Sequence, residues 1–248
     1  MNKGRVPKLK DLFVEDMQKR ILSGNFDIGE KIPTERELAN QMGVSRQVVN
    51  SGISELVRRG FLRVVPRHGT YVADYRVDGN INTLNAIMEY KGVFANNEEI
   101  KSILEIHWGL ELIILRDVME KAEEKDLDFL YTKVEKIREA ETDREVAEAA
   151  FDFEHSMTLI CENDVLALVY VSFRPIVTIL WERFVYLYGK DALYYSKEQT
   201  LQSIREKDKD AIRKRLEELR RKVLIEDNRF FESAEPKVSF CNAHKQNA

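Results

Sequence analysis

The chain has 248 residues, of which 44% are hydrophobic and 33% charged, with only 11 glycines and 5 prolines. This composition suits one large or two medium helix-rich domains with an ample core. Apolar runs such as Leu112–Leu115 are far too short to span a membrane, and the polar, basic residues 1–10 lack the apolar core of a secretion signal. Two cysteines, Cys161 and Cys241, exclude a disulfide framework. A cytoplasmic location is therefore expected, with no membrane partner.

Charge is distributed unevenly along the chain. Residues 1–75 hold 13 Lys and Arg against 9 Asp and Glu, an excess of 4 positive charges. The remaining residues hold 26 against 34, an excess of 8 negative charges. A positive first part would be attracted to a polyanion such as nucleic acid, whereas the acidic second part would not.

Three helices are predicted in the first part. The first spans Lys8–Leu22, where apolar residues recur at helical spacing. The second starts at Thr34, an N-cap that forms a capping box with Glu37, and the third starts at the N-cap Ser45. Glycines mark the ends of the second and third helices, at Gly43 and Gly60.

The hydrophobic period then changes from helical to strand-like. The runs "FLRVV" and "TYVADY" flank "PRHG" and predict a two-stranded hairpin. From Arg76 onward the predicted helices cover 81–89, 98–121, 126–142, 144–161, 164–188, 197–207 and 209–231. The expected fold class is mainly α: a winged helix-turn-helix of three helices plus a β-hairpin wing, then an all-helical bundle of six or seven helices. The expected boundaries are a head at 1–75, a linker at 76–82, a helical domain at 83–232 and a disordered polar tail at 233–248.

The start of the third helix carries small polar and cationic side chains opposite its apolar stripe. In a helix-turn-helix this first turn meets base edges in the major groove, where Arg binds guanine and Gln or Asn binds adenine. The same side chains would also suit a simply solvated helix. The caps, the hairpin with Arg67 and His68 at its tip, and the positive charge together favour DNA binding. The candidate residues on the helix are Ser45, Arg46, Gln47 and Asn50.

The stretch "ILSGNFDIGEKIPTERELANQMGVSRQVVNSGISELVRRGFLRVVPRHGTYV" resembles the N-terminal domain of GntR-type bacterial transcriptional regulators, from about Lys8 to Asp74. The pattern "G…IP(T/S)ERELA…GVSR" and the wing "G…HGT(Y/F)V" occur in order. The sequence departs from the family at "RQVVNSGI", with Asn50 for the usual Arg and Gly52 for the usual Ala, so no known operator is transferred. The resemblance implies DNA contacts by Arg36, Ser45, Arg46, Gln47, His68 and Gly69.

Residues from about 84 to 231 resemble, more weakly, the helical domain of the FadR branch of this family. Many members bind a divalent metal through an Asp and a His four residues apart and two later His. Here Phe151 lies four residues before His155, and Asp152 lies three before it. No cofactor is therefore predicted; if a divalent metal is bound, Asp152 and His155 are its candidate ligands. The later His positions correspond to Lys197 and Leu219.

Other members of the branch bind a small molecule without a metal, and this sequence is closer to that pattern. His107 lies where the family commonly has an Arg facing the cavity, so it either binds an acid effector or is a satisfied polar group. Arg174 precedes Pro175, which predicts a kink, and it either lines a pocket or points outward. The candidate effector-binding residues are His107, Asp152, His155 and Arg174.

The sequence thus predicts a homodimeric, ligand-responsive transcriptional regulator, by default a repressor, that reads a short palindrome in double-stranded DNA. Its effector is expected to be a small acid or acyl-type molecule in the helical domain. The alternatives are a metal-dependent carboxylate sensor of the same family and an architectural DNA binder without an effector. An enzyme is not expected, because no nucleophile elbow, phosphate loop or catalytic pair is recognisable.

Overall fold

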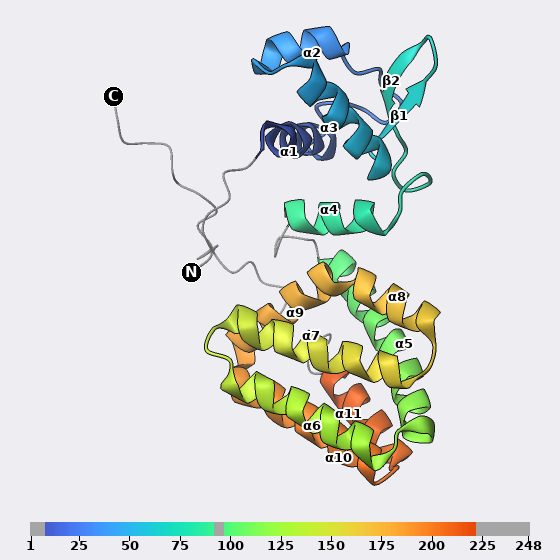
Figure 1. The fold of residues 1–248 in the computed structure, drawn as a ribbon, viewed down its shortest axis with the longest axis vertical. Helices are drawn as coiled ribbons and strands as arrows, with labels where there is room; N and C mark the ends of the chain where they lie inside the picture. Colours follow the sequence, from blue (N-terminus) through green and yellow to red (C-terminus); the bar gives the residue numbers. More distant parts are fainter. Residues whose placement is uncertain (1–7, 92–96, 222–248) are drawn as a thin grey trace, which may run out of the picture. The chain divides into compact units, whose positions relative to one another are not determined.

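The computed structural model describes residues 8–91 and 97–221. The chain divides into two compact units, Met1–Tyr90 and Lys91–Ala248 (Figure 1). The predicted fold class is confirmed: a helix-turn-helix with a two-stranded wing is followed by a helical domain.

The first unit contains the three predicted helices and the hairpin. Their bounds are α1 (Leu9–Leu22), α2 (Glu35–Met42), α3 (Arg46–Arg58), β1 (Leu62–Val65) and β2 (Gly69–Val72). The strands are antiparallel, with Leu62 opposite Val72. The predicted caps are confirmed: Thr34 and Glu37 form a capping box, and the Ser45 side chain accepts a hydrogen bond from the backbone N–H of Val48.

The core of the first unit forms where the apolar faces of α1, α2 and α3 meet one another and the hairpin. The central side chains are almost completely buried, because the helical spacing of the apolar residues puts them on one face of each helix. They include Phe13, Met17, Leu38, Val49 and Leu56.

A fourth helix, α4 (Ile81–Lys91), packs on this core. Ala86 belongs to the core cluster, with Ile87 packed against it, and Thr83 is 2% exposed. The first unit therefore extends to Tyr90, whereas the sequence predicts a linker at 76–82 and a new domain from 83. The reason for the difference is that the short apolar stripe of α4 is buried against the head.

The second unit is helical. Its elements are α5 (Asn97–Lys121), α6 (Glu124–Glu139), α7 (Asp143–Ile160), α8 (Asp164–Ser172), α9 (Arg174–Tyr188), α10 (Lys190–Arg205) and α11 (Lys209–Arg221). α7 is central and packs against α5, α6, α8, α9 and α10, and α6 runs beside α10 (Figure 1). Small residues on α7, Ala147 and Ala150, are fully buried and allow these close approaches.

Two predicted helices differ from the structure. The helix expected over 164–188 is two helices, α8 and α9, bent by 61° at the break around Phe173. The helix expected from Lys197 begins at Lys190, because Gly189 separates it from α9 and the aromatic run that follows is helical. The predicted tail at 233–248 and the end of the last predicted helix lie outside the described residues.

No individual helix in the described part of the chain is both long and apolar enough to cross a membrane; α8 and α9 meet that test only as a sharply bent pair.

Candidate nucleic-acid interface and buried polar cluster

The N-terminal turn of α3 presents its polar side chains to solvent. Arg46, Gln47 and Asn50 are exposed, while Val49 and Ile53 on the opposite side are buried. The Ser45 hydroxyl caps the helix at 3.3 Å from the Val48 nitrogen, so the start of the helix is well defined. A positive helix end with an exposed Arg suits an anionic partner.

The second helix contributes to the same surface. Arg36 on α2 is exposed. The Asn50 side-chain amide donates to the Glu35 carboxylate at 3.2 Å and so connects α2 to α3. Asn50 therefore has a structural partner in addition to its predicted role toward DNA.

The wing tip is a tight turn with positive backbone dihedrals. Arg67 has a φ of 66° and Gly69 a φ of 123°, and the His68 N–H donates to the Val65 carbonyl at 3.0 Å. The Arg67 and His68 side chains are exposed. A Cβ at position 69 would stand 2.6 Å from Cε of Lys31, so the stem of this lysine lies against the wing. Sequence reasoning missed Lys31, whose position follows from an isolated bridge between Lys31 and Tyr71.

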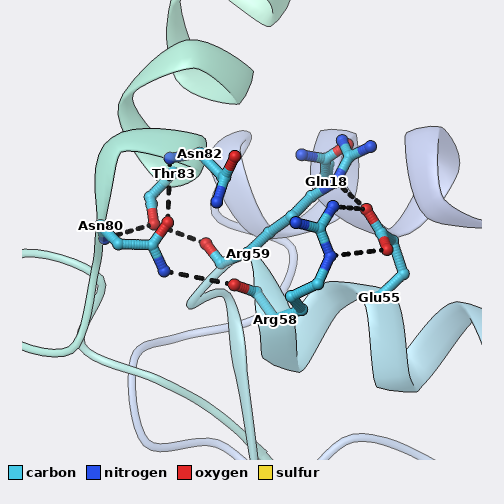
Figure 2. A network of polar contacts seen from close by, with 7 residues as sticks. All are labelled: Gln18, Glu55, Arg58, Arg59, Asn80, Asn82 and Thr83. Carbon is cyan, nitrogen blue, oxygen red and sulfur yellow. Dashed lines mark hydrogen bonds and ion pairs between the residues drawn. The ribbon is translucent and has the colours of Figure 1, made fainter. Parts of the chain in front are cut away.

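The C-terminal end of α3 is capped by the start of α4 (Figure 2). The Asn80 amide donates to the Arg58 carbonyl at 3.2 Å, and the Thr83 hydroxyl donates to the Arg59 carbonyl. The Asn80 N–H in turn donates to the Thr83 oxygen at 2.8 Å. These bonds satisfy carbonyl groups that a helix end leaves without intrahelical partners.

The arginine side chains at this end are also engaged. Glu55 accepts from Arg58 at 2.6 Å and from Arg59 at 2.7 Å, and Arg59 donates to Gln18 on α1 at 3.2 Å (Figure 2). The hydrogen bond from Arg58 is the largest cause that lowers the pKa of Glu55, from 4.5 to about 2; burial opposes it and Arg59 assists it. The network ties α1, α3 and α4 into one body.

The second unit contains a buried polar cluster centred on Glu154. This carboxylate is 1% exposed, accepts hydrogen bonds from three side chains and faces a fourth. One oxygen accepts hydrogen bonds from Trp181 Nε1, at 3.2 Å, and from the Tyr170 hydroxyl. The same oxygen faces His107 Nε2 at 3.4 Å. The other accepts from the Lys197 ammonium.

Lys197 is the buried cation of the cluster. Its side chain is 2% exposed, and its ammonium lies 3.8 Å from Oε1 of Glu111 and 4.2 Å from the centre of the Trp181 ring. Five helices thus contribute to the cluster. Glu111 and His107 lie on α5, Glu154 on α7, Tyr170 on α8, Trp181 on α9 and Lys197 on α10.

Burial and neighbouring opposite charges together shift the pKa values of the cluster. Burial raises the pKa of Glu154, but the Lys197 ammonium and His107 outweigh it and hold the pKa well below its usual range. Burial raises the pKa of Glu111, against the opposing effect of Lys197. Burial lowers the pKa of His107, but the Glu154 carboxylate reverses this and raises it overall.

The four predicted effector residues lie in two groups. His107 belongs to the buried cluster. Asp152, His155 and Arg174 gather around the Phe151 ring and are only partly buried. Arg174 donates to Asp152 at 2.7 Å and lies 4.3 Å from the ring centre, and the His155 ring stacks on the same ring at 6.0 Å. Burial and Arg174 lower the pKa of His155.

The described residues of this domain do not fit a divalent metal. Among the described residues no three His, Cys, Asp or Glu side chains gather where they could hold one. The candidate ligand Asp152 is paired with a guanidinium, and that positive charge would repel a metal ion. At one position where the family is expected to carry a metal-binding His, this chain has Lys197, whose buried ammonium is paired with Glu154.

Sequence reasoning missed most of the cluster. It did not single out Glu111, Glu154, Tyr170, Trp181 or Lys197 as functional candidates. One signal was available: Glu154 interrupts the apolar face of α7 between Phe151 and Met157, and a charge at a buried position requires a partner.

The first unit defines the class of this protein: a winged-helix DNA-binding protein. Residues 12–72 match the model of bacterial regulatory proteins of the gntR family, and residues 102–222 match the FCD domain. The chain therefore belongs to the GntR family of bacterial transcriptional regulators, with an FCD domain as its second unit. The matched families and relatives are regulators and not enzymes.

Several known proteins are similar to this chain. The HTH-type transcriptional regulator LutR of Bacillus subtilis is 26% identical over 173 residues, which cover 68% of this chain and 77% of LutR. The uncharacterized HTH-type regulator YcbG of the same organism is 28% identical over 153 residues, 62% of each chain. The arabinose metabolism transcriptional repressor of Geobacillus stearothermophilus is 34% identical over 83 residues, 34% of this chain but 22% of that protein.

A solved structure has the same fold. The chain superposes with a TM-score of 0.63 on Lar, which controls the expression of the Listeria monocytogenes agr system. The two are 16% identical, and the match covers 91% of this chain and 99% of that one.

Proposed function

We propose that this protein is a sequence-specific, ligand-responsive repressor of the FadR branch that acts in the cytoplasm as a homodimer on a short palindromic operator. The observation that carries the proposal is the exposed, capped start of α3 with Arg46 and Gln47 beside the wing tip. Arg46 would read guanine, and Gln47 would read adenine. Arg36, Ser45, Asn50, Arg67, His68 and Gly69 would complete the interface through phosphate and groove contacts.

Dimer formation is supported by an exposed apolar face on α8. Val165 is 71% exposed, Leu168 66% and Val169 40%, while the same helix buries Leu166 and Tyr170. Clustered aliphatic side chains on a single short helix are typical of an interaction surface. A two-fold symmetric dimer would place two heads on the two half-sites of a palindrome.

An effector in the second unit is supported by its polar interior. Charged groups are rarely buried without a functional or structural reason, and this cluster holds two carboxylates and an ammonium. A small acid bound beside this cluster would act by favouring a dimer state whose heads no longer match the half-sites. Repression is proposed because about a third of the chain is similar to proteins named as repressors, 34% of its length in one match and 31% in another.

The alternative of an architectural DNA binder without an effector is favoured by one observation: the cavities beside the cluster are small, about 10 and 20 Å³. Ligand binding by the purified protein separates the two possibilities.

The proposal is tested by gel shift on the promoter region next to the protein's own gene. We expect a sequence-selective shift that weakens steeply as salt rises, because phosphate contacts release counterions. Absence of any selective shift there and on neighbouring promoters would refute it. The DNA-binding part is thus tested without any ligand.

A further inference from the structure

A small polar cavity lies between α5, α10 and α11. Its volume is about 10 Å³, enough for about one water molecule. Its polar lining includes Glu111, Lys197, Thr200 and Arg215. An apolar cavity of about 20 Å³, lined by Leu104, Trp108 and Leu180 among others, shares Leu219 of α11 with it.

The donors of the buried cluster are already in use. Glu154 accepts hydrogen bonds from the Trp181 indole, the Tyr170 hydroxyl and the Lys197 ammonium, and it faces the His107 ring. The Lys197 ammonium also faces Glu111 and the Trp181 ring. A simple carboxylate that entered the cluster would have to displace Glu154 from these donors. The cluster therefore favours a ligand that brings its own cationic or donor group.

Two atoms of the polar cavity remain without partners. Glu111 is 4% exposed, and among the described residues neither its Oε2 nor Nη1 of Arg215 has a hydrogen-bond partner, although both atoms are buried. The other terminal nitrogen of Arg215 donates to the Ser203 hydroxyl at 3.1 Å, which fixes the guanidinium. Leaving such atoms unsatisfied is unfavourable. One wall of the cavity thus offers an open acceptor, and another offers an open cationic donor.

We propose that this cavity is the polar end of the effector site and that it binds a small apolar α-amino acid. The ligand's ammonium would donate to Glu111, its carboxylate would accept from Arg215, and its side chain would extend into the adjoining apolar cavity. This inference rests on the proposed ligand-responsive function and specifies the class of the small acid. A ligand with only one of the two charged groups would leave Glu111 or Arg215 unsatisfied.

Helix α11 is the element that must move to admit the ligand. It forms the common wall of both cavities, through Leu219, and Ile212 is its buried side chain in the described range. Exposed ion pairs, Lys209–Glu120 at 3.8 Å and Arg220–Glu105 at 3.3 Å, hold it to α5. Such pairs contribute little stability, so they oppose an outward shift of α11 only weakly.

The test is titration calorimetry and thermal shift on the full chain with alanine, valine, leucine, methionine and phenylalanine. For the tightest ligand, the matched analogues that lack either the amino or the carboxyl group are measured alongside. We expect saturable binding of at least one amino acid, with at least a tenfold loss for both analogues. Glu111→Gln and Arg215→Met should each weaken binding at least tenfold.

The matched controls are Glu98→Gln and Arg213→Met, which carry the same changes on the same two helices, in exposed ion pairs that lie within one helix and outside the cavity. They should leave the affinity within about twofold. Failure of all five amino acids to bind, or undiminished binding by both cavity variants when their melting temperatures are unchanged, would overturn the inference. Because the operator gel shift needs no ligand, that result would leave the DNA-binding proposal intact.

Discussion

The ring of Phe13 on α1 fills the space that a side chain at position 52 of α3 would occupy. A Cβ on Gly52 would stand 2.2 Å from Cδ1 of this ring, and Phe13 is 1% exposed. The glycine, which replaces the usual alanine of the family, thus permits close packing of α1 on the recognition helix.

Gly52→Ala should therefore destabilise the head, although alanine alone would favour the helix by about 1 kcal/mol. Overpacking against a buried ring costs about 1–3 kcal/mol, and a Cβ only 2.2 Å from the ring places this substitution in the upper part of that range, so we expect a net loss of about 1–2 kcal/mol. Chemical denaturation followed by circular dichroism measures this. Ser51→Ala, at the exposed neighbouring position, should be neutral or slightly stabilising; a Gly52 variant as stable as that control would contradict the packing argument.

Arg46→Ala should abolish the selective gel shift and leave the protein folded and dimeric. The side chain is exposed at the start of α3, so if Arg46 reads a base as proposed, its loss removes one contact of about 1–3 kcal/mol from each half-site without disturbing the core. Lys19→Ala, on the exposed side of α1, is the control for the loss of one positive charge. Equal affinity of the Arg46 variant for operator and unrelated DNA is the expected result; retained selectivity would remove Arg46 from the interface.

Acid should lower the stability of the head, because it protonates Glu55. Its pKa is about 2 in the folded protein, against 4.5 for a free side chain, chiefly because Arg58 donates to it. A depressed pKa stabilises the folded state above pH 4.5, and this contribution is lost as pH falls from 4.5 toward 2. Glu55→Gln should lower stability at pH 7 and should flatten the dependence on pH in that window.

The measurement is the denaturation midpoint at several values between pH 7 and pH 2. Glu15→Gln, exposed on α1, is the control for removal of one carboxylate. A Glu55 variant that lost stability with acid as steeply as the wild type would show that the arginine pairs do not stabilise the head.

Local signals made the head predictable. Caps at Thr34 and Ser45, the glycine stops and the change of period at the hairpin each depend on neighbours in the chain. The place of α4 did not follow from them, because its bonds to Arg58 and Arg59 cross 22 and 24 positions. The cluster around Glu154 was harder still to predict from the sequence, since the partners of this residue lie on four other helices. His107 was identified as a candidate, but its partners could not be.

Leu168→Glu should convert the proposed homodimer to a monomer. The side chain is 66% exposed on an apolar face of α8, and a carboxylate there would have to be desolvated in an interface. Light scattering after size exclusion gives the mass directly. Phe129→Glu, which is 48% exposed on α6, provides the control and should remain dimeric. A Leu168 variant with unchanged mass over a dilution series would place the dimer contact elsewhere.

Lys197 should be the most sensitive position in the second unit. Its ammonium is the cation that compensates Glu154, and both side chains are at most 2% exposed. Lys197→Met leaves a buried carboxylate without its cation, and breaking such a pair costs about 3–5 kcal/mol. The double variant Lys197→Met/Glu154→Gln removes both charges and should recover part of the loss. Lys214→Met, exposed on α11, is the control and should behave as the wild type.

A chelator and added zinc test whether a metal ion is bound beside Glu154 in place of the Lys197 ammonium. Since Lys197 already supplies the positive charge, neither a chelator nor added zinc should shift the melting temperature of the wild-type protein. A stoichiometric metal in the purified protein, or a melting temperature that falls with chelator, would contradict the assignment of this ammonium as the resident cation. So would a single variant no less stable than the double variant, because the penalty arises from the uncompensated charge on Glu154.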